Sequence, residues 1–219
     1  MRSHISLRGR VSLAKVAAFY RLGTKYEIPD LRIEAIRRLS NDYPDELELF
    51  DQNRNSQLIE GRAADVVNLA REMNILSVLP SALYCCSAFY TTGEILGGKK
   101  RSDGSTAIMS LDDQKICLLG RDKLTRLQAT ETFSWLANEF EGSCLDLKCV
   151  NGRDALIGIL FIWSPACRAL HRRRRIWERE FCAPCVAAFA DSHALGRKNI
   201  WNLLPSIFDL PPWEELLKT

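Results

Sequence analysis

Residues 27–43 have the sequence EIPDLRIEAIRRLSNDY, and this stretch decides the fold class that we expect. Apolar side chains recur in it at steps of three and four residues, at Ile28, Leu31, Ala35, Ile36 and Leu39. Such spacing places them on one side of an α-helix and leaves Arg32, Arg37 and Arg38 to solvent. Pro29 suits the first turn, where backbone N–H groups have no partner within the helix. The stretch therefore predicts an amphipathic helix.

Similar patterns continue along most of the chain. They predict further helices over 63–73, 81–90, 118–140, 153–163 and 186–198. The segment 81–90 is apolar on nearly all sides, which is typical of a helix in the middle of a bundle. No segment shows the strict alternation of a half-buried strand. We therefore expect an all-α protein, an irregular helical bundle in two parts.

One stretch interrupts these patterns. Residues 97–105 contain three glycines, two serines and several charges but no apolar side chain, a composition typical of a linker. Their glycines and lysines lack the spacing of a phosphate-binding loop. We expect a helical region over 11–95, a linker over 96–106 and a C-terminal helical domain over 107–219.

The composition is that of a folded protein in a reducing compartment. Of the 219 residues, 47% are hydrophobic and 26% are charged, close to the average for globular proteins. The N-terminus lacks the apolar segment of a signal peptide, and Pro80 interrupts the longest uncharged run, 73–93. We therefore expect no membrane span and a location in the cytoplasm or nucleus, where the eight cysteines stay reduced or bind metal.

Four cysteines have the spacing of a metal site. Cys144 and Cys149 flank four residues, and Cys182 and Cys185 form a C-x-x-C with a proline inside. Two close pairs of thiolates match the tetrahedral coordination of Zn²⁺, and four protein ligands are typical of a structural site. We therefore predict one structural zinc ion bound by these four cysteines, which staples the C-terminal half of the chain.

Other interpretations of the cysteines stay open. One alternative is that the four are ordinary buried thiols. Another is that the C-x-x-C is a redox pair, although that motif normally occurs in a βαβ unit. Cys167 and His193 are substitute ligands, but both fall on apolar faces and fit packing better. Cys85 and Cys86 point in different directions on a helix and Cys117 stands alone, so we expect these three in the core.

A second cluster is basic. Residues 167–180 contain six arginines and two glutamates, and such a cluster can bind phosphates or act as a nuclear import signal. It can equally be a solvated face that is balanced by the acidic residues between positions 42 and 51, because the net charge of the chain is only +3. Nucleic-acid binding through Arg172–Arg175 is therefore the alternative function and not the leading one.

Catalytic motifs are scarce. The three histidines belong to no recognisable nucleophile motif, and the H-E-x-x-H, G-x-S-x-G and dinucleotide-binding patterns are absent. We therefore expect a protein that is not an enzyme.

Several segments, in order, resemble one known group of proteins. They are 22–39 (LGTKYEIPDLRIEAIRRL), 66–72 (VVNLARE), 79–84 (LPSALY) and 204–216 (LPSIFDLPPWEEL), together with the paired cysteines. From about Val16 onward the chain is similar to the helical region that follows the BTB/POZ domain in fungal BTB/POZ proteins. The resemblance implies an adaptor-like protein that binds protein partners and has no catalytic residues.

The chain departs from that group at its start. In the group an α/β core precedes this helical region, and residues 1–10 do not resemble it. Dimerisation and cullin binding, which use that core, are therefore not carried over. Without it, the helices over 14–20 and 27–43 should expose an apolar face, from which we expect self-association. The leading interpretation is a non-enzymatic protein-interaction module; the alternative is a zinc-containing nucleic-acid-binding module.

Overall fold

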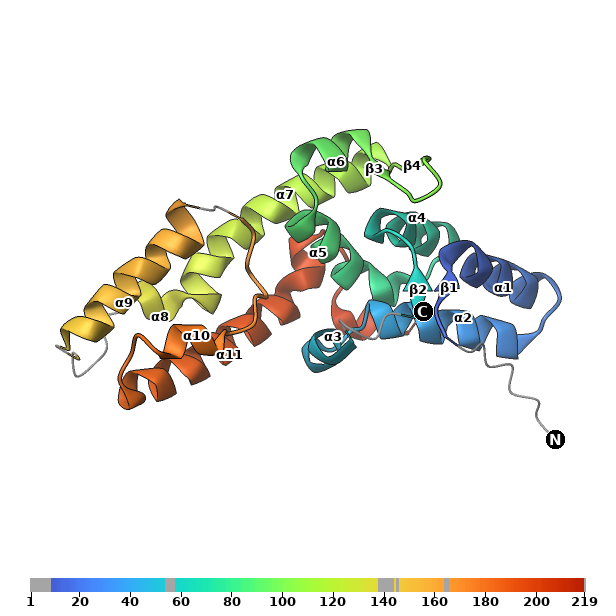
Figure 1. The fold of residues 1–219 in the computed structure, drawn as a ribbon. Helices are drawn as coiled ribbons and strands as arrows, with labels where there is room; N and C mark the ends of the chain where they lie inside the picture. The colour runs from blue at the N-terminus through green and yellow to red at the C-terminus, as the bar shows by residue number, and fades with distance from the viewer. Residues whose placement is uncertain (1–8, 54–57, 138–143, 145, 164–165, 219) are drawn as a thin grey trace. The chain divides into compact units, whose positions relative to one another are not determined.

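The computed structural model describes residues 9–53, 58–137, 144, 146–163 and 166–218. Helices make up most of these residues (Figure 1), which confirms the predicted all-α class. Strand pairing in the described part is limited to two short pairs. β1 (Val11–Ser12) pairs in parallel with β2 (Ile59–Glu60), and β3 (Lys99–Lys100) pairs antiparallel with β4 (Thr106–Ala107). Among the described residues, no helix combines the length and hydrophobicity needed to cross a bilayer.

The chain divides into two compact units. The first comprises residues 1–118 and 208–219, and the second comprises residues 119–207. This division differs from the expected one, because residues 96–106 lie inside the first unit. The β3–β4 pair orders this glycine-rich stretch, and Arg101 forms an ion pair with Asp65. The C-terminal tail also returns to the first unit, where Phe208 and Leu216 are fully buried.

The first unit is a helical bundle built mostly from the predicted segments. Its helices are α1 (Leu13–Lys25), α2 (Pro29–Asp42), α3 (Leu47–Asn53), α4 (Ala63–Met73), the 3-10 turn η1 (Leu76–Val78), α5 (Leu79–Phe89), α6 (Thr92–Gly97), the start of α7 (Leu111–Leu127) and α12 (Trp213–Leu216). Pro29 occupies the first turn of α2, as predicted. Most of α5 is buried, which agrees with its apolar composition. Cys86 and Cys117 lie in the core, whereas Cys85 is half-buried.

One arginine of α2 is buried, which the sequence pattern did not predict. Only 1% of Arg38 is exposed, and its Nε donates to Oε1 of Glu34 at 2.8 Å. Its Nη1 donates to the carbonyl oxygens of Gly9 at 2.9 Å and Leu58 at 3.3 Å. These two residues precede β1 and β2, so Arg38 ties both strands to α2. The amphipathic pattern placed Arg38 on the solvent side because it cannot show that strands from outside the helix cover that side.

The second unit contains the end of α7 and a series of shorter elements. They are the π-helical turn η2 (Gln128–Thr132), α8 (Ser134–Ala137), α9 (Leu147–Ile157), the π-helical turn η3 (Gly158–Ile162), α10 (Arg175–Glu178) and α11 (Ala183–Ile207). The helix predicted over 118–140 is thus interrupted by η2, and its last residues, 138–140, lie outside the described part.

The π turn η3 changes which side chains of the predicted 153–163 helix face the core. Leu156 and Leu160 are buried as expected, but Ile159 and Trp163 are exposed by 46% and 73%. A π turn holds more residues than an α turn, so it rotates the side chains that follow it. A constant 3.6-residue period would place Ile159 and Trp163 on the same side as Leu156 and Leu160, and the π turn breaks that period.

Helix α11 is longer than predicted and continues through Pro205. Gly196 within this helix has a packing role. A Cβ at this position would lie 2.3 Å from the carbonyl oxygen of Glu131. Only glycine therefore lets α11 lie this close to η2.

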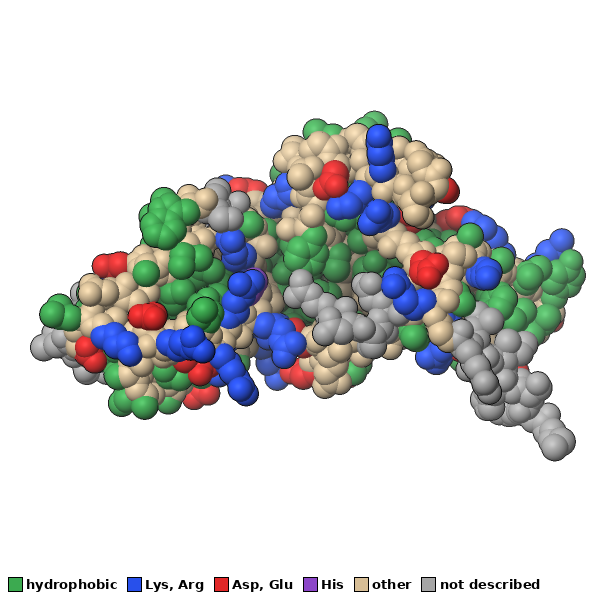
Figure 2. Space-filling model, viewed as in Figure 1, with side chains coloured by type: hydrophobic (Ala, Val, Ile, Leu, Met, Phe, Trp, Pro, Cys, Tyr) green, Lys and Arg blue, Asp and Glu red, His purple; other side chains and the backbone are tan. Residues whose placement is uncertain are grey.

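Exposed apolar side chains gather at the end of the α1–α2 pair, and Figure 2 shows hydrophobic side chains there. They are Leu22, Tyr26, Ile28 and Ile33, with exposed fractions between 39% and 61%. This apolar tip lies on the two helices for which the sequence predicted an uncovered face. The self-association inferred from such a face stays a prediction.

Candidate metal centre

The four cysteines of the predicted site lie together in the second unit. The sulfur atoms of Cys144, Cys149, Cys182 and Cys185 all lie within 4.8 Å of one another. The sulfurs of Cys144 and Cys182 are 3.7 Å apart. In a tetrahedral site with metal–sulfur bonds of about 2.3 Å, neighbouring sulfurs are separated by about 3.8 Å. The cluster therefore has the size needed to hold one tetrahedral metal ion.

Two helix starts position half of the ligands. Cys149 lies in the first turn of α9, where the Asp146 side chain accepts a hydrogen bond from the N–H of Lys148 at 2.9 Å. Cys185 lies in the first turn of α11, directly after Pro184. The positive end of a helix dipole favours a negative thiolate at such a position. The two helix starts thus place Cys149 and Cys185 in the cluster.

Hydrogen bonds connect the sulfurs to the backbone. The N–H of Cys182 donates to the sulfur of Cys149 at 3.1 Å. The N–H of Cys185 donates to the sulfur of Cys182 and lowers the pKa of that thiol. Burial raises the pKa of the Cys149 and Cys185 thiols. Cys182 therefore loses its proton more readily than Cys149 and Cys185. The backbone provides the second layer of contacts that orients metal ligands.

Close packing of α9 against the segment before Cys182 brings the two cysteine pairs together. A Cβ at Gly152 would lie 2.7 Å from both the Cβ and the carbonyl oxygen of Glu180. A larger residue would separate the two segments that carry the ligands. Gly152 and Asp146 thus support the site, and neither was singled out from the sequence. The sequence offered two signals for these supporting residues. One is a glycine within a helical pattern, and the other is an Asp three residues before a cysteine.

The cluster adjoins the aromatic core of the second unit. Cys149 and Cys185 belong to this core, and Cys144 and Cys182 pack against it. Trp135 stacks on Phe189 with ring centroids 4.5 Å apart, and Phe181 contacts both rings edge-on. A bound ion would therefore link two helix starts to a well-packed core.

The substitute ligands considered from the sequence lie elsewhere. Cys167 is half-buried and does not belong to the cluster. His193 is 2% exposed among aromatic rings, with the Phe133 centroid 5.3 Å away. Its Nδ1 accepts from Nε1 of Trp135 at 3.4 Å, and its Nε2 donates to the carbonyl oxygen of His171 at 2.9 Å. His193 is thus a hydrogen-bonded core residue.

The buried His193 makes stability dependent on pH. Burial lowers its pKa from 6.5 to about 4, and the nearby Arg197 acts in the same direction. Between these two values the unfolded chain binds a proton at this position that the folded chain excludes. The free energy of unfolding should therefore fall as the pH drops from 6.5 to 4, by about 3 kcal/mol for this group.

Urea unfolding of the natural protein and of His193→Gln, followed between pH 4 and 7, measures this effect. Tryptophan fluorescence reports mainly on the second unit, which holds four of the five tryptophans. Thiolates that bind a metal ion would also take up protons in this range, so the informative quantity is the difference between the two stability profiles. The variant should be less stable at pH 7 and lose less stability on acidification. Parallel stability profiles of the two proteins would show that His193 does not cause the pH dependence. His171→Gln serves as the control.

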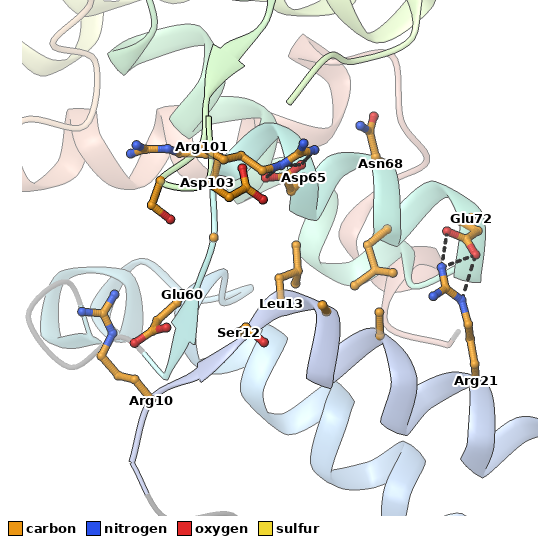
Figure 3. A pocket seen from close by; sticks show the side chains of 16 residues that line it. Arg10, Ser12, Leu13, Arg21, Glu60, Asp65, Asn68, Glu72, Arg101 and Asp103 are labelled. Carbon is orange, nitrogen blue, oxygen red and sulfur yellow. Dashed lines mark hydrogen bonds and ion pairs between the residues drawn. The ribbon is translucent and has the colours of Figure 1, made fainter. Parts of the chain in front are cut away.

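The first unit contains a polar cavity of about 740 Å³, which we considered as a second candidate site (Figure 3). The ion pair between Arg21 of α1 and Glu72 of α4 and the one between Arg101 and Asp65 cross its walls. Four arginines and four acidic residues line it, so their charges cancel. The described residues that line it include neither histidine nor cysteine. The cavity therefore offers no soft metal ligands, and the cysteine cluster remains the candidate site.

No protein-family model, curated protein or solved structure compared with the chain matches it. The geometry of the cysteine cluster and the surfaces around it therefore indicate the function.

Proposed function

We propose that the protein is a non-enzymatic, adaptor-like interaction module whose second unit is stapled by one structural Zn²⁺. The observation that carries this proposal is the convergence of four cysteine sulfurs within 4.8 Å. A site with four protein ligands leaves no coordination position for water or substrate, which is typical of structural and not of catalytic zinc.

The zinc ion would join segments that are far apart in the chain. Cys144 and Cys149 come from the start of α9, and Cys182 and Cys185 come from the start of α11. The chain between the two pairs contains the rest of α9, the π turn η3, α10 and irregular stretches. Closing this long loop through a metal ion would add to the folding free energy, since the ion binds the folded unit and not the unfolded chain.

The apolar tip of the α1–α2 pair supports the interaction role. Exposed apolar patches on soluble proteins mark contact sites with other proteins, and Tyr26 and Ile33 are exposed by about 60%. The resemblance of these helices to the region after a BTB/POZ core supports the same role. The occupant of the tip would be a protein partner or a second copy of the chain.

The metal content of protein purified without added zinc tests the staple. We expect about one zinc ion per chain. Iron also binds to four thiolates, but an iron site is coloured and a zinc site is not. A chelator should release the ion and increase the number of thiols that react in the native protein. Less than about 0.1 ion per chain, with no effect of the chelator, would end the zinc assignment. Reproducible catalytic turnover would contradict the non-enzymatic part.

A further inference from the structure

We propose that the arginine surface of the second unit binds the phosphate backbone of nucleic acid. We define the arginine surface as Arg172, Arg173, Arg174, Arg175 and Arg179. These residues lie between η3 and the C-x-x-C pair and take no part in the cysteine cluster. The inference rests on how the fold holds and exposes this segment, and it does not require the zinc ion.

The chain just before the arginine surface is firmly anchored. Three consecutive carbonyl oxygens each accept a hydrogen bond from a side chain of another element. The acceptors belong to Ala169, Leu170 and His171, and the respective donors are Thr132 Oγ1, Arg197 Nε and His193 Nε2. The last two distances are 3.1 Å and 2.9 Å. Ala169 and Leu170 are buried, so this segment forms a fixed base for the residues that follow.

The arginines that follow the base are exposed. Residues 172–174 are irregular, and Arg175 begins the short helix α10. All five arginines of the surface are exposed, and Figure 2 shows a row of Lys and Arg side chains on this part of the molecule. Arg173 pairs with Glu178 at 2.7 Å. Within the part of the chain that the structure describes, Arg175 and Arg179 have no ion-pair partner.

Further contacts limit the freedom of individual side chains. The His171 ring stacks on the buried Trp177 with centroids 5.7 Å apart. Nη2 of Arg174 lies 3.3 Å from Nε2 of His171, and the Arg173 guanidinium lies 5.8 Å from the Phe189 ring centroid. Arginines that are partly ordered before binding lose less conformational entropy when a ligand is bound.

The chemistry of the cluster favours phosphate as the ligand. All basic residues of 167–180 apart from His171 are arginines, and the guanidinium group binds phosphate oxygens through two parallel hydrogen bonds. Duplex nucleic acid carries one negative charge per about 1.7 Å of its axis, so it can occupy several of these groups at once. A helix that binds anionic membranes needs a long apolar face beside its cations, and α10 has only four residues.

Binding of a mixed-sequence DNA duplex of about 20 base pairs, followed by fluorescence anisotropy at several salt concentrations, tests this proposal. The test variant is Arg174→Gln with Arg175→Gln. The matched control is Lys15→Gln with Lys115→Gln, which removes the same charge from exposed positions of the first unit. The test variant should bind at least about tenfold more weakly at low salt and lower the log–log salt slope by about 2. The control should behave like the natural protein.

A conservative variant separates charge from geometry. Arg174→Lys with Arg175→Lys should keep the salt slope but lose part of the affinity, because lysine cannot form the bidentate contact. Unchanged metal content and unfolding curves show that a variant is folded. Absence of DNA binding at low salt would overturn the proposal. Equal losses in the test and control variants, or binding to phosphatidylserine vesicles without binding to DNA, would overturn it as well.

Discussion

Replacing Cys182 by serine is expected to remove the metal ion and lower the free energy of unfolding of the second unit by more than about 4 kcal/mol. Cys182 lies 3.7 Å from the sulfur of Cys144, and its own N–H donates to the sulfur of Cys149. Its thiol also has a lowered pKa. Serine keeps the backbone contact but provides a hydroxyl that stays protonated and binds zinc poorly. Three ligands would then hold the ion too weakly to staple the helix starts.

A matched control exists in the same unit. Cys167 is half-buried and lies outside the cluster, so Cys167→Ser should keep the metal and cost about 1 kcal/mol. Cys117→Ser provides a second control in the first unit, where the thiol is fully buried. Metal analysis and urea unfolding by tryptophan fluorescence compare the three variants. If Cys182→Ser kept its full metal content and were as stable as Cys167→Ser, the proposed structural zinc site would be contradicted.

Replacing Arg38 by leucine is expected to destabilise the first unit by about 3–5 kcal/mol, the usual cost of breaking a buried ion pair. The guanidinium is 1% exposed and donates to Glu34 and to the carbonyl oxygens that precede both strands. Leucine would leave these oxygens without this donor. The β1–β2 pair should loosen first, because Arg38 joins both of its strands to α2.

Arg37 is the matched control, because it binds the same carboxylate from the solvent side. Its Nε lies 2.8 Å from Glu34, but its side chain is 50% exposed. Arg37 contributes most to lowering the pKa of Glu34 to about 2, yet an exposed pair adds only about 0–1 kcal/mol to stability. Arg37→Leu should therefore cost far less than Arg38→Leu. Unfolding followed by circular dichroism measures the stability of both variants, and hydrogen exchange in residues 11–12 and 59–60 reports on the strand pair. Equal losses of stability in the two variants would show that the burial of Arg38 does not determine its contribution.

Much of the local structure of the chain follows from its sequence alone. The period of apolar residues predicted α2 and α4 to within two residues, and Pro29 was correctly placed in the first turn of α2. Such features depend on neighbours one helical turn apart, so they can be read without knowing the fold. Cysteine spacing identified the cluster in the same way, since a C-x-x-C at a helix start lets two sulfurs face one ion.

Features that depend on distant neighbours are visible only in the folded structure. The burial of Arg38 requires strands from outside its helix, and the exposure of Trp163 follows from a π turn that a fixed period ignores. The cysteine pairs meet because Gly152 admits the backbone of Glu180. The arginine surface has a fixed base because donors from α11 and η2 reach three successive carbonyls. Apart from the π turn, each of these contacts joins residues far apart in the chain, and local periodicity carries no information about such pairs.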